Sequence, residues 1–287
     1  MKPLRWYGRL LGFALVLPLF FVSVSMGQDL PKLIFSLGND GYLPRRAIEE
    51  ATGAEIKRDL GRVELTDFSL VILSDTPYQS LPSEVQKGLV EFVQKGGSLL
   101  VTGGPNAYGS GGYAGTDIGD VLPLKPSRTD WLPHPFGPTF IIQPGHPILS
   151  GVTIITMAHF NELDLNSGAV EIAQYRAASK AGVQAGGMTG AGTPIGGPGT
   201  PAVPGGVGIG VVPSPTGAGE AGGIQGGGRR PMPLVAEGRS GSGTVIAIAL
   251  DLTQTGSWKD RDLFVVNTIK YLMERSKLGP PKPKSER

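Results

Sequence analysis

Short, almost continuous apolar runs alternate with amphipathic stretches along much of the chain. The clearest runs cover residues 68–73 and 98–102, and each is apolar at nearly every position, as in a strand buried on both faces. The segment between them has one apolar helical face, made by Val85, Leu89, Phe92 and Val93. Gly96 and Gly97 end that helix. The pattern therefore predicts a strand–helix–strand unit with two parallel strands.

The same alternation continues on both sides of this unit. Further strands are predicted at residues 32–37, 54–60, 140–142, 170–175 and 244–250, and further helices at 43–52, 116–121 and 262–274. Helical crossovers between buried strands favour a parallel sheet with helices on both faces. We therefore predict an α/β fold with an open, mostly parallel sheet.

The first 27 residues have the parts of a secretory signal peptide. A basic start precedes an apolar run over residues 10–24, and Ser25 and Gly27 supply the small residues of a cleavage site before Gln28. We therefore expect a secreted or periplasmic protein. The alternative is that the segment stays uncleaved and residues 10–26 anchor the protein in a membrane. No cysteine follows the run, so a lipoprotein anchor is excluded.

A long stretch rich in glycine and proline, residues 178–230, interrupts the alternating pattern. It has too little apolar surface to offset its ordering entropy, so we predict a disordered insertion. The segment after it is too small for a core of its own, which favours a single domain over residues 28–277. A charged tail, 278–287, follows the domain. An alternative role for residues 182–228 is self-association.

Charge and composition narrow the function classes. The whole chain has a formal charge of +2, but residues 1–27 carry three basic and no acidic side chains, which leaves −1 for the remainder. This balance gives no support to nucleic-acid binding, which needs a clustered positive face. The chain contains no cysteine, so no disulfide can stabilise an exported domain.

Several segments together resemble the class I glutamine amidotransferase-like domain of exported and membrane-anchored bacterial proteins. They are residues 70–75, the helix ending at Gly96-Gly97, the strand at 98–102, the loop 103–115 that begins Gly-Gly-Pro-Asn, and the closing pattern 238–251 with Trp258. The resemblance covers most of residues 30–125 and 231–275. It implies a flavodoxin-like fold.

The resemblance does not extend to the family's chemistry. Active members use a cysteine nucleophile on a strand-to-helix elbow, because a thiolate must attack the amide of glutamine. This chain has no cysteine, and no Gly-x-Ser-x-Gly elbow replaces it. We therefore expect no catalytic residues of the family type, no cofactor, and a non-catalytic module that binds an envelope protein or a small molecule. Membrane contact is expected only if the signal segment stays uncleaved.

Candidate ligand contacts follow from the fold class. In an open α/β sheet the ligand crevice lies beyond the carboxyl ends of the strands. The residues expected there are Asp40, Asp75, Gly103, Gly104, Asn106 and Tyr108. The alternative for Asp75 and Asn106 is a structural role in capping turns and helix ends.

A different function on the same fold is an envelope hydrolase that uses carboxylate, histidine or metal chemistry. Its acid–base candidates are Asp40, Asp75 and His146, if their loops converge. A metal site is not predicted, because His159 and Glu162 share a face only in a helix and make at most half a site. No Lys-Ser/Thr follows the glycine-rich loop, which argues against a nucleotide site.

Overall fold

The computed structural model describes residues 32–126, 131–133, 139–156, 159–175, 231–254 and 258–278. The predicted signal peptide, the whole of the glycine-rich insertion and the tail after Leu278 lie outside the described residues. Their boundaries remain predictions from the sequence.

An eight-stranded sheet forms the centre of the domain, in the order β2-β1-β3-β4-β12-β11-β10-β7. Its strands are β1 (Leu33–Gly38), β2 (Glu55–Lys57), β3 (Leu70–Ser74), β4 (Ser98–Thr102), β7 (Thr139–Ile141), β10 (Val170–Tyr175), β11 (Met232–Ser240) and β12 (Gly243–Ile248). Neighbours from β2 to β12 are parallel, and the remaining pairs are antiparallel. The parallel part has the strand order of flavodoxin-like folds, which confirms the predicted fold class.

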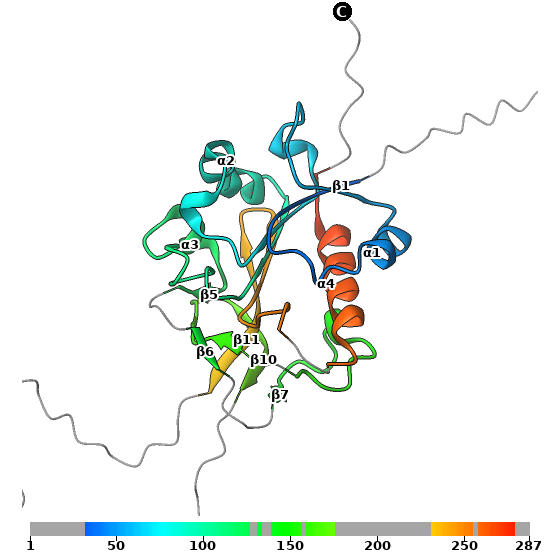
Figure 1. The fold of residues 1–287 in the computed structure, drawn as a ribbon, viewed down its shortest axis with the longest axis vertical. Coiled ribbons are helices and arrows are strands. Elements are labelled where there is room, and N and C mark those ends of the chain that lie inside the picture. Colours follow the sequence, from blue (N-terminus) through cyan, green and yellow to red (C-terminus); the bar gives the residue numbers. More distant parts are fainter. Residues whose placement is uncertain are drawn as a thin grey trace, which may run out of the picture. The chain divides into compact units, whose positions relative to one another are not determined.

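Helices cover both faces of this sheet (Figure 1). On one face α1 (Arg45–Thr52) packs with α4 (Arg261–Arg275), and on the other α2 (Ser83–Gln94) packs with α3 (Asp117–Val121). The central strands β3 and β4 are buried at every position, because each must fill the space under two helical layers. None of the helices among the described residues is long and apolar enough to cross a membrane.

Smaller elements complete the domain. They are the 3₁₀ helices η1 (Leu65–Asp67), η2 (Tyr78–Ser80) and η3 (Pro147–Leu149), and the short antiparallel pairs β5 (Leu124–Lys125) with β9 (Asp164–Leu165) and β6 (Trp131–Pro133) with β8 (His159–Asn161). The pair β6–β8 lies in the weakly patterned middle of the sequence, where no strand was predicted.

The parallel strands end in register, so their following loops meet at one edge of the sheet. Gly38 of β1 pairs with Ser74 of β3, Ser74 with Thr102 of β4, and Thr102 with Ile248 of β12. We call the loops after these residues the carboxyl edge. The pair β10–β11 also reaches this edge, where Tyr175 lies opposite Met232. The chain therefore leaves for the glycine-rich insertion, and returns from it, at the carboxyl edge.

Candidate functional site

Asp75 forms a sharp turn at the end of β3. Its φ of 45° lies in the left-handed region, which a residue with a side chain rarely adopts and which costs conformational energy. The carboxylate accepts hydrogen bonds from the backbone N–H of Asn106 at 2.6 Å and from its side-chain amide at 3.3 Å. These two bonds hold the turn in place.

Glycines on the neighbouring strands make room for this turn. A Cβ on Gly38, at the end of β1, would overlap the backbone oxygen of Ser74 and the hydroxyl of Thr76. A Cβ on Gly104, after β4, would overlap the carboxylate of Asp75. The turn at Asp75 therefore requires glycine at positions 38 and 104, because a side chain at either position would overlap the turn.

A second carboxylate acts on Asp75. Burial raises the pKa of Asp75, the hydrogen bonds from Asn106 lower it in part, and the nearby charge of Asp251 raises it further, so the net shift is upward. Asp251 follows β12, is only 2% exposed, and accepts hydrogen bonds from the backbone and the hydroxyl of Thr253. Two acidic side chains from different strands thus influence one point of the carboxyl edge.

Buried hydroxyl groups lie beneath these carboxylates. The Tyr42 hydroxyl is 2.8 Å from the hydroxyl of Ser74 and also bonds to Thr102. Burial, together with the charges of Asp40 and Asp251, raises the pKa of Tyr42 to about 12. Tyr42 is therefore a neutral phenol that links the ends of β3 and β4. Nothing in the local sequence marks Tyr42, because its partners come from distant strands.

Asp40 has a structural role. It is 4% exposed and accepts hydrogen bonds from Ser36 at 2.9 Å, Arg45 at 2.6 Å, and Arg58 at 2.6 and 3.3 Å. Burial alone would raise the pKa of Asp40, but the bonds from Arg58 and Ser36 and the charges of both arginines outweigh it and lower the pKa. These partners occupy both carboxylate oxygens, so Asp40 joins β1, α1 and the segment after β2.

Three other predicted contacts also serve the scaffold. Gly103 donates its N–H to Leu250, and the Asn161 side chain bonds both the N–H and the carbonyl of Gly104, at 3.0 and 3.1 Å. The fully buried Tyr108 hydroxyl donates to backbone carbonyls of β4 and β12. The Tyr108 hydroxyl thus points into the sheet rather than to the surface of the loop. Of the six predicted residues, Asp75 and Asn106 remain at the surface.

The histidines do not join this cluster. His146 bonds Glu237 of β11 through Nε2 at 3.0 Å, and Tyr271 of α4 donates to the same carboxylate at 2.8 Å. His134 lies outside the described residues. The three candidates of the hydrolase hypothesis therefore have separate partners rather than a shared site.

His159 lies in a strand, not in the helix that a shared face with Glu162 requires. Its ring stacks on Trp131 with centroids 4.8 Å apart, and its Nδ1 is buried with no hydrogen-bond partner among the described residues. Within the ranges that the structure describes, no group of three or more histidine, cysteine, aspartate or glutamate residues could hold a metal ion.

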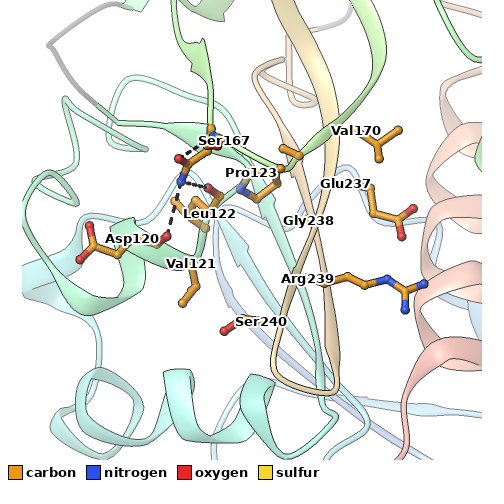
Figure 2. A pocket seen from close by; sticks show the side chains of 13 residues that line it. Asp120, Val121, Leu122, Pro123, Ser167, Val170, Glu237, Gly238, Arg239 and Ser240 are labelled. Atoms are coloured by element: carbon orange, nitrogen blue, oxygen red, sulfur yellow. Dashed lines mark hydrogen bonds between the residues drawn. The ribbon is translucent and has the colours of Figure 1, made fainter.

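A well-formed cavity lies at the opposite edge of the sheet. Its volume is about 340 Å³, and its walls are residues 120–123, 166–170 and 237–240 (Figure 2). Ser240 ends β11 where the hairpin turns into β12, so this cavity is remote from Asp75. The sequence did not mark it.

Comparisons with known proteins identify the fold but no family. No family model and no curated protein matches the chain. A cytoplasmic protein of Salmonella typhimurium superposes with a TM-score of 0.54 at 14% identity, over 84% of this chain and 98% of that protein. A second, from strain LT2, gives 0.52 at 13% identity, over 84% and 99%. At such identities the likeness shows a shared fold alone.

A putative ThuA-like protein of Bacteroides uniformis also aligns, with a TM-score of 0.48 at 9% identity, over 87% of this chain and 94% of that protein. This likeness is too distant to add to the argument. The fold that the amidotransferase resemblance implies is therefore present, and its activity is a separate question.

Proposed function

We propose that the chain is a non-catalytic amidotransferase-like domain, exported to the cell envelope, that binds a ligand or partner protein at the carboxyl edge. The observation that carries the proposal is the strained turn at Asp75. Strain of this kind persists where the surroundings enforce it, and it gathers at functional sites. The turn also lies where open α/β sheets bind their ligands.

The absence of cysteine from the 287-residue chain supports the non-catalytic part of the proposal. Without a thiolate no thioester can form with glutamine. At the ends of the two central strands the chain presents an aspartate and two glycines, residues 75, 103 and 104, which supply no such nucleophile.

The groups near this edge favour a particular ligand chemistry. The carboxylate of Asp75 and the side-chain oxygen of Asn106 are acceptors, and Asp251 adds negative charge nearby. Acceptors of this kind suit a ligand rich in hydroxyl or ammonium groups, as in sugars and cell-wall fragments. Two carboxylates near one point disfavour a phosphate or another anion.

A thermal-unfolding screen tests the proposal. The panel holds sugars, cell-wall fragments, glutamine, nucleotides and divalent metals with a chelator control. A ligand at a hundredfold excess over its Kd stabilises the folded state by about 2.7 kcal/mol. The shift should disappear in Asp75→Asn and persist in Glu274→Gln, which removes the same charge from an exposed site on α4. A shift that survives in Asp75→Asn would refute this site.

Export is tested separately by the amino terminus of the mature protein. Cleavage of the predicted signal makes Gln28 the first residue, whereas an intact amino terminus in a membrane fraction would support anchoring by residues 10–26.

An alternative function is hydrolysis, favoured by the raised pKa of Asp75. A carboxyl group whose pKa lies above its ordinary value is better suited to general acid catalysis than an unperturbed one. Asp40 and His146 have other partners, so the second carboxylate of this alternative is Asp251, whose charge acts on Asp75. Hydrolysis of a glycoside or peptide substrate that Asp251→Asn abolishes would replace the binding proposal with this one.

A further inference from the structure

A second cavity lies beside the cavity of about 340 Å³ at the far edge. The second cavity, of about 350 Å³, shares Asp120 and Asn166 with the first and extends past Gly115 and Lys125. The side-chain amide of Asn166 donates to the carbonyl of Leu122 at 3.1 Å and so fixes the wall between them. We call the two cavities together the α3 groove.

One wall of the α3 groove is the outer edge of the end of β11. β11 pairs with β12 as far as Ser240, which lies opposite Gly243, but it pairs with β10 only as far as Glu237, which lies opposite Val170. Within the part of the chain that the structure describes, no strand lies beside the outer edge of residues 238–240.

The backbone of Arg239 points to that open edge. The carbonyl of Leu234 accepts a hydrogen bond from Ala249, on the β12 side. Backbone groups alternate in direction along an antiparallel strand, so the N–H and carbonyl of Arg239, five residues later, point away from β12. Figure 2 shows the Arg239 side chain projecting toward α4, away from α3.

We infer that the α3 groove binds an extended peptide segment of a partner protein, which adds as a strand beside β11 in line with β10. A free strand edge offers main-chain hydrogen bonds that suit an extended peptide. Val121 and Pro123, on the α3 face of the sheet, supply apolar contacts for alternate side chains of the peptide, and the 47% exposed Val170, opposite Glu237 on the α4 face, contacts a side chain between them. The exposed carboxylate of Asp120, on α3, complements a basic residue that follows two positions later on the same side of the peptide. This site is independent of the carboxyl edge and goes beyond the proposed function.

The first test compares two substitutions of one residue. The probe is the blocked peptide acetyl-Val-Thr-Val-Thr-Lys-amide, which has both valines and the lysine on one side, titrated into the isotope-labelled full chain and followed by NMR. Arg239→Pro removes the outward N–H but no bond to β12, whereas Arg239→Ala keeps that N–H. We expect Arg239→Ala to bind like the parent protein and Arg239→Pro to bind about tenfold more weakly. Equal affinities of the two variants, or no shift of the Ser240 amide at millimolar peptide, would overturn the inference.

The second test uses the unchanged protein, so it can be carried out even if Arg239→Pro fails to fold. Two peptides each carry one N-methyl group, on successive central amides. In a strand only one of these amides points to the partner, so one methyl group should abolish binding and the other should leave it intact. Equal sensitivity at both positions would mean that the peptide does not bind as a strand.

Discussion

Asp75 and Asn106 are 31 residues apart in sequence, yet the carboxylate of the first accepts hydrogen bonds from both the backbone and the side chain of the second. The contact joins the turn after β3 to the loop after β4. It compensates for the left-handed backbone of Asp75 and for the partial burial of its charge. Asn106 is exposed despite this contact, so a ligand can reach its side chain.

Asp75 should make folding stability depend on pH. A carboxyl group with a raised folded pKa binds a proton that the unfolded chain releases, so its contribution is complete below the unfolded value of 3.8 and is lost as the pH rises through the folded value. Asp75→Asn cannot ionise and lacks this dependence. Urea denaturation from pH 3.5 to 7 should therefore show the wild type losing stability relative to Asp75→Asn.

The expected change is about 1 kcal/mol or less, because the side chain is only partly buried. Glu274→Gln serves as the control, since it removes an exposed carboxylate on α4. A wild type that gains stability over Asp75→Asn with rising pH would mean that the Asn106 hydrogen bonds outweigh desolvation.

Gly38→Ala should destabilise the domain by about 3 kcal/mol or more. The new Cβ would meet the backbone of Ser74 and the hydroxyl of Thr76, and the φ of 89° is itself unfavourable for alanine. Gly53→Ala is the matched control, because Gly53 also has a positive φ, 65°, but open space around it. Its cost should be near 1 kcal/mol, the conformational term alone. If chemical denaturation shows that Gly38→Ala and Gly53→Ala lose similar amounts of stability, then crowding at the Asp75 turn is unimportant.

The sheet could be predicted because each central strand is a continuous apolar run that can be recognised from its own residues. The runs at 68–73 and 98–102 are apolar on both faces, and the observed strands β3 and β4 begin and end within two residues of them. Helix α4 was likewise predicted within one residue at each end, since its apolar face repeats over 15 residues.

The site was only partly predictable, because its other members depend on long-range contacts. Asp75 was found from its position after a buried strand. Asn161, which fixes Gly104, comes from a short strand in a segment without clear periodicity. A tyrosine in a glycine-rich loop looks exposed in sequence, whereas Tyr108 is buried beneath the loop, and this burial depends on contacts with β4 and β12.

The buried Glu237 should contribute to stability at neutral pH. Burial alone raises its pKa, but hydrogen bonds from His146 and Tyr271 outweigh that effect, so the pKa lies below the usual 4.5. Its contribution is therefore present above the unfolded value and is lost as the pH falls through the folded one. Glu237→Gln should cost about 1–3 kcal/mol at pH 7 and progressively less below pH 4.5 in denaturation experiments.

Tyr271→Phe provides the comparison for Glu237, because it removes one of the two side-chain donors and leaves the carboxylate in place. It should cost about 1 kcal/mol, with a smaller dependence on pH than Glu237→Gln. A loss for Glu237→Gln that stays constant from pH 7 to 3 would show that the ionised carboxylate is not what stabilises β11 against α4.

Tyr108→Phe should separate the scaffold from the ligand site. Its hydroxyl lies 3.1 Å from the carbonyl of Val101 and 3.0 Å from that of Ile248, so its loss leaves buried acceptors poorly satisfied where β4 and β12 end. We expect a loss of about 1–2 kcal/mol in unfolding free energy. The affinity for a ligand found in the thermal screen should not change, because the hydroxyl points into the sheet.

Asn106→Ala should show the reverse, with weaker ligand binding and a smaller loss of stability, because Asn106 is exposed. If calorimetric titration instead shows that Tyr108→Phe weakens binding as much as Asn106→Ala, then the loop must open to admit the ligand, and the binding surface includes the face that now covers Tyr108.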